Sequence, residues 1–483
     1  MLRLNIADPL ELEAGFDAIR TELDIPGRFS KEVLAEAAEA TVDSGLPDAA
    51  NRVDATNVAF VAIDPPGSTD LDQAFAARRV GDGYQVSYAI ADVAAFVRPG
   101  GAIDREARER GSTMYLPDGR APLHPAIVSE DRASLLADTA KPALLWTIDL
   151  DGYANPTDWR LERANVRVRA AISYATAQAI IDRTAKPGPG VDIEICDLLA
   201  EIGRLRQARE AQRGGVSLKI PAQEIEKIDG SYQLRFDETL PVEEWNAQIS
   251  LLTGMVAGRT MVGSGIGIVR TLPPALDRDI DRLRRTAQGL GLNWPTSVSY
   301  ADYVREMRPT EPETMAFLLQ ATRTLRGAGY VGFNGEVPEH PEHSAIASVY
   351  SHVTAPLRRL VDRFGNEILL SHFAGRTPPA WALEALDELP SMMGRARQRE
   401  SSLERALLDM SEALTLQSYI GDNFDALVVD VRADRNEARI QIAKPAIVAK
   451  IAANGLELAD TVSVCLKSVD VKARRLSFEA VES

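Results

Sequence analysis

Cysteine is nearly absent from the 483-residue sequence, which contains only Cys196 and Cys465. Two cysteines exclude the multiple-disulfide framework of small secreted domains. Both lie in apolar surroundings, IEICDLL and VSVCLKS, so we expect them to pack as small hydrophobic side chains. This usage fits a reducing compartment, and the predicted location is the cytoplasm.

Long hydrophobic runs are also missing. No apolar stretch reaches the roughly 18 residues that a membrane-spanning helix needs. The N-terminal stretch MLRLNIADPLELEAGFDAIR contains acidic side chains and no apolar core, so it does not resemble a secretory signal peptide. The sequence therefore predicts no membrane partner, and nothing in it indicates an obligate protein partner.

Positive charge is in deficit, with 54 Lys and Arg against 70 Asp and Glu and a net charge of -16. Because phosphates are bound by Lys and Arg, a nucleic-acid site would have to be a local basic channel in an acidic exterior. Arginines that could line such a channel occur in three groups, within residues 98–120, 358–363 and 395–405. Acidic residues are interleaved in each group, so we expect many of these arginines to form ion pairs.

Histidine is scarce too, with five in the chain. Four of them show no zinc-binding spacing: His124, His340, His343 and His372. Ser351, His352 and Asp362 would be the members of a hydrolase triad, but no G-x-S-x-G elbow surrounds the serine. We therefore expect His352 to be a structural hydrogen-bonding residue.

What the sequence does contain is a short acidic stretch, AIDPPGSTDLDQAF, at residues 62–75. A strand-like segment leads into Asp64, and the following PPG imposes a turn. Asp70 and Asp72 are two residues apart, so they project to the same side of an extended chain. Three carboxylates gathered in this way need a cation, and hard oxygen ligands favour Mg²⁺ or Mn²⁺. The alternative is a solvated acidic turn; the spacing does not fit an EF-hand loop.

The pattern of predicted elements divides the chain into three parts. Residues 1–50 are acidic and are expected to hold one or two helices, including SKEVLAEAAEAT with Ser30 as its N-cap. Residues 51–418 mix strands at 58–63, 84–90 and 144–150 with helices at 243–262, 277–291 and within 380–418. Residues 419–483 contain short strands separated by turns, which predicts a small all-β barrel. The predicted fold class is α+β.

The acidic stretch and two later blocks resemble the ribonuclease II family of RNB-type exoribonucleases. The family signature Ile-Asp-x-x-x-x-x-Asp-x-Asp-Asp-Ala reads here IDPPGSTDLDQA, and family-like sequence continues through residues 88–125. YSHVTAPLRRLVD at 350–362 resembles the family's Tyr-x-His-Phe-Thr-Ser-Pro-Ile-Arg-Arg-Tyr-x-Asp, and SLERA at 402–406 lies where the family has Ala-Glu-Arg. The resemblance implies an RNB catalytic domain, a mixed sheet with surrounding helices, followed by an S1-type OB domain over 419–483.

The resemblance also implies an activity, the hydrolytic 3′→5′ degradation of single-stranded RNA to nucleoside 5′-monophosphates with Mg²⁺. Carried over residue by residue, Asp64, Asp70 and Asp72 match metal-binding or metal-supporting aspartates, and Gln73 falls at a fourth metal-ligand position. Asp72 matches the aspartate most critical for chemistry. The catalytic group implied in this way consists of Asp72, Asp70 and Arg358.

RNA contacts are implied by the same resemblance. Tyr115 matches an aromatic residue that stacks on the terminal bases, and Arg358 matches the arginine that contacts the scissile phosphate. Glu404 matches a glutamate near the 3′-terminal nucleotide, and Thr354, in the block of Arg358, is also expected to contact RNA. The predicted partner is therefore single-stranded RNA.

Several departures from the family pattern qualify these expectations. Gln73 is neutral where the family has an aspartate, so the site is expected to bind divalent ions more weakly, to need more metal or to prefer Mn²⁺. Residues 250–258, SLLTGMVAG, lie where the family commonly has Ala-Asn-Glu. Residues 1–50 are too few for the family's two N-terminal cold-shock domains, which predicts a short form with lower processivity. The 419–483 region is poor in aromatic residues, so a weak grip on single strands is expected.

The predicted function is thus metal-assisted hydrolysis of single-stranded RNA from its 3′ end. Two alternatives remain open from the sequence. One is a catalytically impaired RNB-type protein that still binds RNA but has lost its chemistry at Gln73. The other is a phosphodiesterase that acts on short oligonucleotides or on substrates other than RNA.

Overall fold

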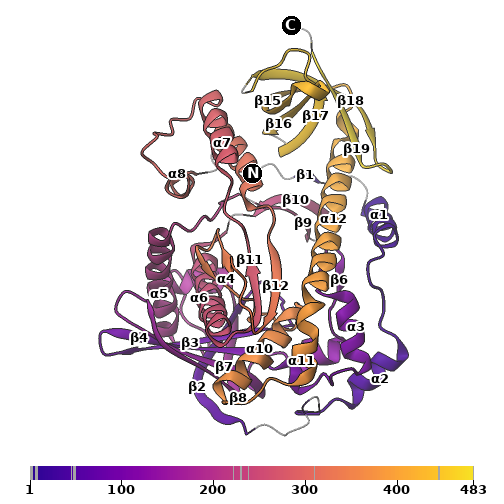
Figure 1. Ribbon diagram of the computed structural model, residues 1–483. Coiled ribbons are helices and arrows are strands. Elements are labelled where there is room, and N and C mark those ends of the chain that lie inside the picture. Colours follow the sequence, from indigo (N-terminus) through magenta and orange to yellow (C-terminus); the bar gives the residue numbers. More distant parts are fainter. Residues whose placement is uncertain are drawn as a thin grey trace.

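The computed structural model describes residues 4–5, 9–44, 46, 51–220, 222–228, 231–237, 239–308, 311–443, 446–458 and 460–481. Figure 1 shows a large α+β body below, a small all-β unit above it, and the long helix α12 (Leu389–Leu416) running up from the body to the all-β unit. The predicted α+β class is confirmed. The division of the chain at residues 50 and 418 stays a prediction.

The centre of the body is a closed five-stranded barrel with the strand order β2-β3-β4-β7-β8. Its neighbours pair antiparallel, except that β2 pairs with β8 in parallel. Alternate residues of β2 enter two different cores, Val61 and Ile63 in one and Phe60 and Ala62 in the other. The strand bounds are Val53–Asp64, Gln73–Val80, Gly83–Ala91, Ala140–Leu150 and Pro156–Ser173.

Helices cover the barrel. The long buried helix predicted at 243–262 is α6 (Pro241–Ser264), which packs against α5 (Ile193–Arg213). Gly203 permits this close approach, since a Cβ there would lie 2.3 Å from the Cβ of Trp245. Further elements of the body are α2 (Lys31–Glu39), α3 (Ala102–Arg110), α4 (Tyr174–Ile181), α10 (Leu360–Phe373), α11 (Ala380–Glu384) and the paired strands β11 (Ile266–Thr271) and β12 (Gly329–Asn334).

Three helices lie between the body and the all-β unit: α7 (Asp277–Gly289), α8 (Tyr300–Glu306) and α9 (Pro312–Ala321). They pack around Trp294 and Phe317, together with Val429 of the all-β unit. The prediction that a helix spans 277–291 holds through Gly289, and Gly291 then takes a left-handed φ of +68°. Leu276 occupies the N-cap position of this helix and has no capping side chain.

The all-β unit is an antiparallel five-stranded sheet of order β17-β16-β15-β18-β19, which curls into a nearly closed S1/OB-like barrel. Asp430 on β15 is 5% exposed and pairs with Arg282 of α7 at 2.9 Å and Arg323 at 2.8 Å, with Arg432 at 3.8 Å. The pairs with Arg282 and Arg323 fasten the unit to the body, whereas Arg432 belongs to the same strand as Asp430. In chain order the strands are Asn423–Arg432, Glu437–Ala443, Ala446–Ala452, Thr461–Asp470 and Arg475–Ala480.

The N-terminal region contributes α1 (Pro9–Glu22), which lies beside α12 (Figure 1). Leu12, Phe16 and Ile19 of α1 share a core with α12 and with the short hairpin of β5 (Met114–Leu116) and β6 (Gly119–Ala121). Arg20 of α1 pairs with Asp118 in the hairpin turn at 2.5 Å. Glu22 pairs with Arg474 of the S1/OB-like barrel at 2.6 Å. This helix therefore contacts α12, the β5–β6 hairpin of the body and the S1/OB-like barrel.

Two smaller expectations have mixed outcomes. Ser30 caps α2 as predicted, its hydroxyl accepting a hydrogen bond from the Val33 amide at 3.3 Å. Cys196 is buried as expected, whereas Cys465 is only half-buried, because it alternates along its strand with Val464 and Leu466, which enter the core. Within the described residues, the helices are all too short or too polar to cross a membrane.

Candidate active site

The acidic stretch connects two adjacent strands of the central barrel. Asp64 is the last residue of β2 and Gln73 is the first of β3. The connecting loop is fixed by backbone hydrogen bonds from Ala91 to the Asp72 carbonyl (2.9 Å) and from Leu135 to the Leu71 carbonyl (3.0 Å). The end of one strand and the start of its neighbour thus bring the carboxylates to one edge of the barrel.

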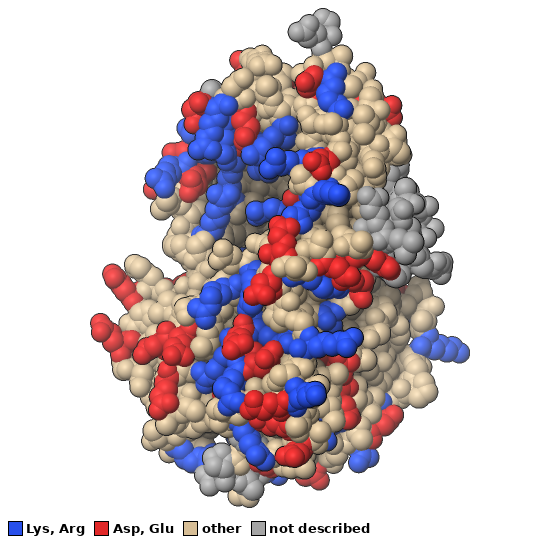
Figure 2. Space-filling model, turned by 90° about the vertical axis from the view of Figure 1, so that its right-hand side faces the viewer, with Lys and Arg blue, Asp and Glu red and all other residues tan. Residues whose placement is uncertain are grey.

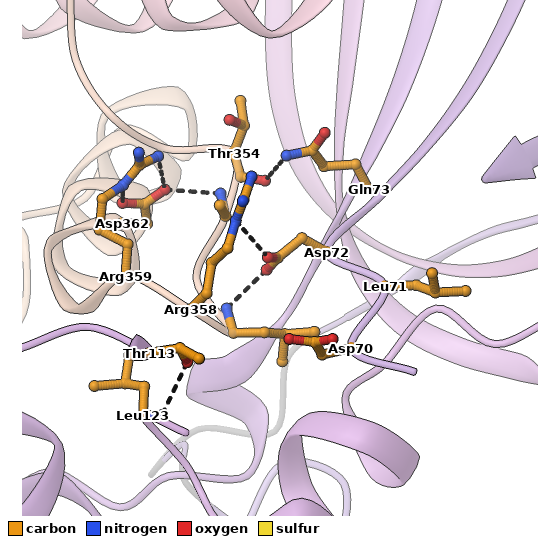
Figure 3. Close-up of polar contacts among 12 residues, drawn as sticks. Asp70, Leu71, Asp72, Gln73, Thr113, Leu123, Thr354, Arg358, Arg359 and Asp362 are labelled. Carbon is orange, nitrogen blue, oxygen red and sulfur yellow. Dashed lines mark hydrogen bonds and ion pairs between the residues drawn. The ribbon is translucent and has the colours of Figure 1, made fainter. Parts of the chain in front are cut away.

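A second loop, residues 350–359, faces this acidic edge (Figure 3). The Leu357 amide donates a hydrogen bond to Asp72 Oδ1 at 2.7 Å, and Arg358 Nε lies 3.5 Å from Asp72 Oδ2. Asp362 fixes the loop from behind, since it accepts hydrogen bonds from the Ala355 amide (2.7 Å) and from Arg359 (2.5 and 2.7 Å). The predicted pair of Asp72 and Arg358 is therefore brought together from two distant motifs of the sequence.

The carboxylates of this edge are poorly neutralised. Burial raises the pKa of Asp72 well above its ordinary value, and Arg358 and the Leu357 amide offset only part of that shift. Burial also raises the pKa of Asp64 to about 7; Arg358 lowers it and Asp70 adds to the rise. One arginine thus serves the buried Asp72 and the half-buried Asp64, and the site is short of positive charge.

Asp70 lies on the outer side of the site. Arg120 Nη1 of β6 pairs with it at 2.5 Å, and the Tyr115 hydroxyl donates to it at 3.4 Å. Arg120 also pairs with Glu130 at 2.8 Å. The hairpin that carries Tyr115 is therefore attached to the acidic stretch through Asp70.

Whether Asp64, Asp70 and Asp72 can bind a divalent metal ion depends on the chemistry of their carboxylates. Among the described residues, no three acidic, histidine or cysteine side chains converge closely enough to cage a metal ion. The Asp64 carboxylate, however, accepts no hydrogen bond from any described residue. Burial raises the pKa of Asp64 and Asp72, so a nearby cation would stabilise the charged form of both carboxylates. RNB-family nucleases typically use Mg²⁺, and an all-oxygen donor set suits that ion.

Gln73 is engaged at both ends of its side chain. Its Nε2 donates to the Thr354 carbonyl at 2.7 Å, as Figure 3 shows. Its Oε1 accepts from the Tyr88 hydroxyl at 2.6 Å and from the Ser250 hydroxyl at 3.4 Å. Thr354 itself is buried, and its carbonyl is occupied by this contact. The predicted fourth metal ligand is thus part of a hydrogen-bond network beside the carboxylates.

A cavity of about 260 Å³ opens next to Arg358. Tyr115, which is 51% exposed, forms part of its wall, as the predicted stacking role requires. Arg397, from the third group of predicted channel arginines, also lines it, whereas three other lining side chains were not predicted from the sequence: Arg270, Tyr330 and Glu400. Arg397 and Glu400 lie on α12 one turn or more before the predicted Glu404, which is exposed. Arg397 and Glu400 precede Glu404 by seven and four residues, which places all three on one face of a helix. This spacing is the feature of the sequence that could have identified them.

The hydrolase triad is absent. Ser351 donates to the Ile268 carbonyl at 2.7 Å, and Asp362 is committed to Arg359. His352 Nδ1 lies 2.6 Å from the Tyr330 hydroxyl, and burial together with Arg359 lowers the pKa of His352 well below its ordinary value. His352 therefore has the structural role expected of it.

Many of the arginines are neutralised, as the interleaved charges predict. Arg110 and Arg363 are buried and pair with Glu106 (2.7 Å) and Asp104 (2.6 Å). Figure 2 shows basic side chains around a hollow in the upper half of one face, and acidic side chains are mixed among the basic ones in both halves.

Comparison with known proteins gives matches over most of the chain. The RNB domain family matches residues 52–374, and the RNase II-type exonuclease C-terminal S1 domain matches residues 422–481. The human exosome complex exonuclease RRP44 is 26% identical over 377 residues, 76% of this chain and 39% of that protein. Ribonuclease R 1 of Lactococcus lactis is 21% identical over 445 residues, 87% of this chain and 53% of that protein. The chain spans about half the length, or less, of these relatives.

Solved structures with the same fold include RNase R of Mycoplasma genitalium in complex with ribose-methylated single-stranded RNA. It matches with a TM-score of 0.87 at 19% identity, covering 99% of this chain and 79% of that one. Yeast Ssd1, described as a pseudonuclease, matches with a TM-score of 0.72 at 15% identity over 96% of this chain and 59% of that one. With its domain matches and barrel fold, this chain belongs to the RNB family and carries an RNase II-type C-terminal S1 domain.

Proposed function

We propose that this protein is a cytoplasmic, metal-dependent 3′→5′ exoribonuclease that hydrolyses single-stranded RNA to nucleoside 5′-monophosphates. One observation carries the proposal: Asp72, buried and poorly neutralised, faces Arg358, which also lines the cavity beside Tyr115. A site short of positive charge next to a basic cavity suits a bound cation and a phosphodiester. Membership of the RNB family supplies the reaction class.

The proposed roles follow from the placement of the residues. Bound Mg²⁺ supplies charge compensation and an activated water, and Asp64, Asp70 and Asp72 would hold it. The Leu357 amide orients Asp72 through its hydrogen bond. The Arg358 side chain, 52% exposed, has a face free to meet the scissile phosphate and to stabilise the charge that develops on it.

The cavity supports proposed RNA contacts. Tyr115 presents its ring for stacking on a terminal base. Glu404 is proposed to lie near the 3′-terminal nucleotide, and Glu400 is the α12 carboxylate that lines the cavity. Thr354 would act through its position in the loop of Arg358, since its carbonyl is bound to Gln73.

The decisive experiment is a time course on a 5′-labelled, unstructured oligoribonucleotide with Mg²⁺, with Mn²⁺ and with EDTA. We expect a descending ladder or a short limit product, which disappears with EDTA. Intact RNA in both metals, together with retardation on a gel, would replace the proposal by a protein that binds RNA without cleaving it.

Two alternatives have an observation in their favour. The neutral Gln73, and the shared fold with the pseudonuclease Ssd1, favour an RNA-binding protein without activity. The small volume of the cavity favours a phosphodiesterase for short oligonucleotides. Equal rates on matched DNA and RNA oligonucleotides would support the second alternative, because recognition of the 2′-hydroxyl would then be absent.

A further inference from the structure

The side chain of Gln73 joins four elements of the fold at one point. Gln73 begins β3, Tyr88 belongs to β4, Ser250 to α6, and Thr354 to the loop at 350–359. The Tyr88 and Ser250 hydroxyls are 2.8 Å apart and both lie within reach of Gln73 Oε1, at 2.6 and 3.4 Å. Tyr88 is 1% exposed and Thr354 is 4% exposed. Gln73 and Ser250 are half-buried, so the network lies at the border of the core, with two of its four members fully enclosed.

The network requires an amide at position 73. The Thr354 carbonyl can only accept a hydrogen bond, so the atom facing it at 2.7 Å has to be a donor. The two hydroxyls supply donors for the amide oxygen. A carboxylate would place an acceptor against the Thr354 carbonyl, and that contact would be repulsive. Glutamine is thus matched to Tyr88, Ser250 and Thr354 together.

The loop fixed by this contact also carries the groups that contact Asp72. Leu357 and Arg358 follow Thr354 by three and four residues, and both reach the Asp72 carboxylate. Asp362 holds the same loop through the Ala355 amide. Between them, Gln73 and Asp362 restrain the loop on either side of the Thr354–Ala355 peptide, and so set where Arg358 lies.

We propose that Gln73 is a positioning residue, which holds the loop of Arg358 against Asp72 and does not ligate metal. The proposal rests on the proposed function in one respect, that Arg358 contacts the RNA phosphate. It differs from the expectation, drawn from the signature, that Gln73 supplies a fourth metal ligand.

The test compares Gln73→Met, Gln73→Asp and Tyr88→Phe with the unchanged protein. Methionine keeps the length of glutamine but makes none of its hydrogen bonds. We expect Gln73→Met to lower kcat by about tenfold to a hundredfold, the scale of a misplaced catalytic group. The affinity for Mn²⁺, measured by electron paramagnetic resonance of the free ion, should stay within about twofold. Tyr88→Phe should lower kcat less, and should add little in the Gln73→Met background.

A metal-ligand role gives the opposite pattern. Gln73→Met would then weaken Mn²⁺ binding severalfold, Gln73→Asp would strengthen it and lower the metal requirement, and Tyr88→Phe would change little. That result would overturn the proposal. Gln85→Met is the matched control, since Gln85 lies on β4 and bonds only Arg78 and Asp149 among the described residues. If Gln73→Met fails to fold, Tyr88→Phe decides the matter alone, because it removes one donor to the amide and leaves the acids unchanged.

A second readout separates this proposal from the proposed function. RNA affinity is measured in EDTA, where no cleavage occurs. We expect Gln73→Met to weaken binding severalfold, and to have no further effect in an Arg358→Ala background. If the unchanged protein cleaves no RNA but shows this pattern, the exoribonuclease proposal fails and the positioning role stands. Additive losses in the two backgrounds would overturn the positioning role.

Discussion

Asp72 and Asp430 are both 5% exposed, yet their surroundings shift their pKa in opposite directions. Burial raises the pKa of Asp72, because Arg358 and one amide offset too little of its effect. Burial also acts on Asp430, but hydrogen bonds and charges from Arg323 and Arg282 outweigh it and lower the pKa. Arginine side chains thus neutralise the buried carboxylate of Asp430, whereas the arginine at the acidic edge neutralises Asp72 only in part. The opposite pKa shifts therefore separate a structural ion pair, in which two arginines neutralise Asp430, from the acidic edge, where Asp72 lies deeper and faces one arginine.

The largest expected effect is on turnover in Asp72→Asn. We expect RNA hydrolysis to fall by about a hundredfold to a thousandfold or more, as when a preorganised electrostatic group is removed. The melting temperature should stay constant or rise, because asparagine can keep the Leu357 hydrogen bond without the buried charge. Single-turnover assays and thermal melts check both values. Hydrolysis at the full rate would remove Asp72 from the catalytic group.

The next effect is on stability in Asp430→Asn. Loss of the charge leaves Arg323 and Arg282 without their partner, and we expect a loss of about 1–3 kcal/mol, less than for fully buried pairs because Arg282 is half exposed. The melting midpoint should fall by several degrees while turnover stays within about twofold. Asp434→Asn is the control, since Asp434 is 78% exposed on the same barrel. An equal fall in both variants would contradict the comparison.

The pH dependence of the two variants should differ in sign. Asp430 has a lowered pKa in the folded state, so its contribution to stability is present above its ordinary value of 3.8 and is lost as the pH falls through the folded pKa. Asp72 has a raised pKa, so its unfavourable contribution grows as the pH rises above 3.8. In EDTA near pH 7, the melting temperature should be lower than that of the unchanged protein for Asp430→Asn, and equal or higher for Asp72→Asn. Both differences in melting temperature should shrink below about pH 4. Thermal melts between pH 7 and pH 4 measure these differences.

The smallest expected effect is on the stability of Arg282→Ala, which we compare with Arg358→Ala because the two arginines have similar exposure. Arg282 is 50% exposed and Arg358 is 52% exposed, and each faces a buried aspartate. Arg282→Ala should cost about 0.5 kcal/mol or less, a shift of a degree or two in melting, because Arg323 remains. Arg358→Ala should lower the melting temperature by a few degrees, because buried Asp72 loses the arginine that offsets part of its burial, and should reduce turnover strongly. A strong loss of turnover in Arg282→Ala would show that the two sites are not independent.

Local features of this fold were predictable from the sequence. The strands around residues 58–63, 84–90 and 144–150 and the buried helix at 243–262 have compositions that identify them, and all four are present. The closed barrel was not predictable, because closure depends on the parallel pairing of β2 with β8, about a hundred residues later. The strand Ala446–Ala452 is difficult to identify from the sequence, since its alanine-rich composition has weak strand character.

The residues of the site also fall into those that the sequence predicted and those that it did not. The aspartates and Arg358 lie in contiguous motifs, so the resemblance to the family was enough to locate them. Tyr88 and Ser250 are ordinary residues of a strand and a helix, and nothing in the sequence connects them with Gln73. Arg270 and Glu400 reach the cavity from elements far apart in the chain. Contacts of this kind follow from tertiary packing, which local pattern does not encode.

The docking of α1 has a consequence for handling the protein. Arg28 is exposed in the turn between α1 and α2, where trypsin can reach the chain. A cut there breaks one peptide bond but leaves the apolar contacts of Leu12, Phe16 and Ile19 in place, together with the ion pairs that join the helix to Asp118 and Arg474. Nicked protein should therefore elute from a sizing column with the intact chain and release its N-terminal peptide only in denaturant. Purity judged by native mass alone would overlook it.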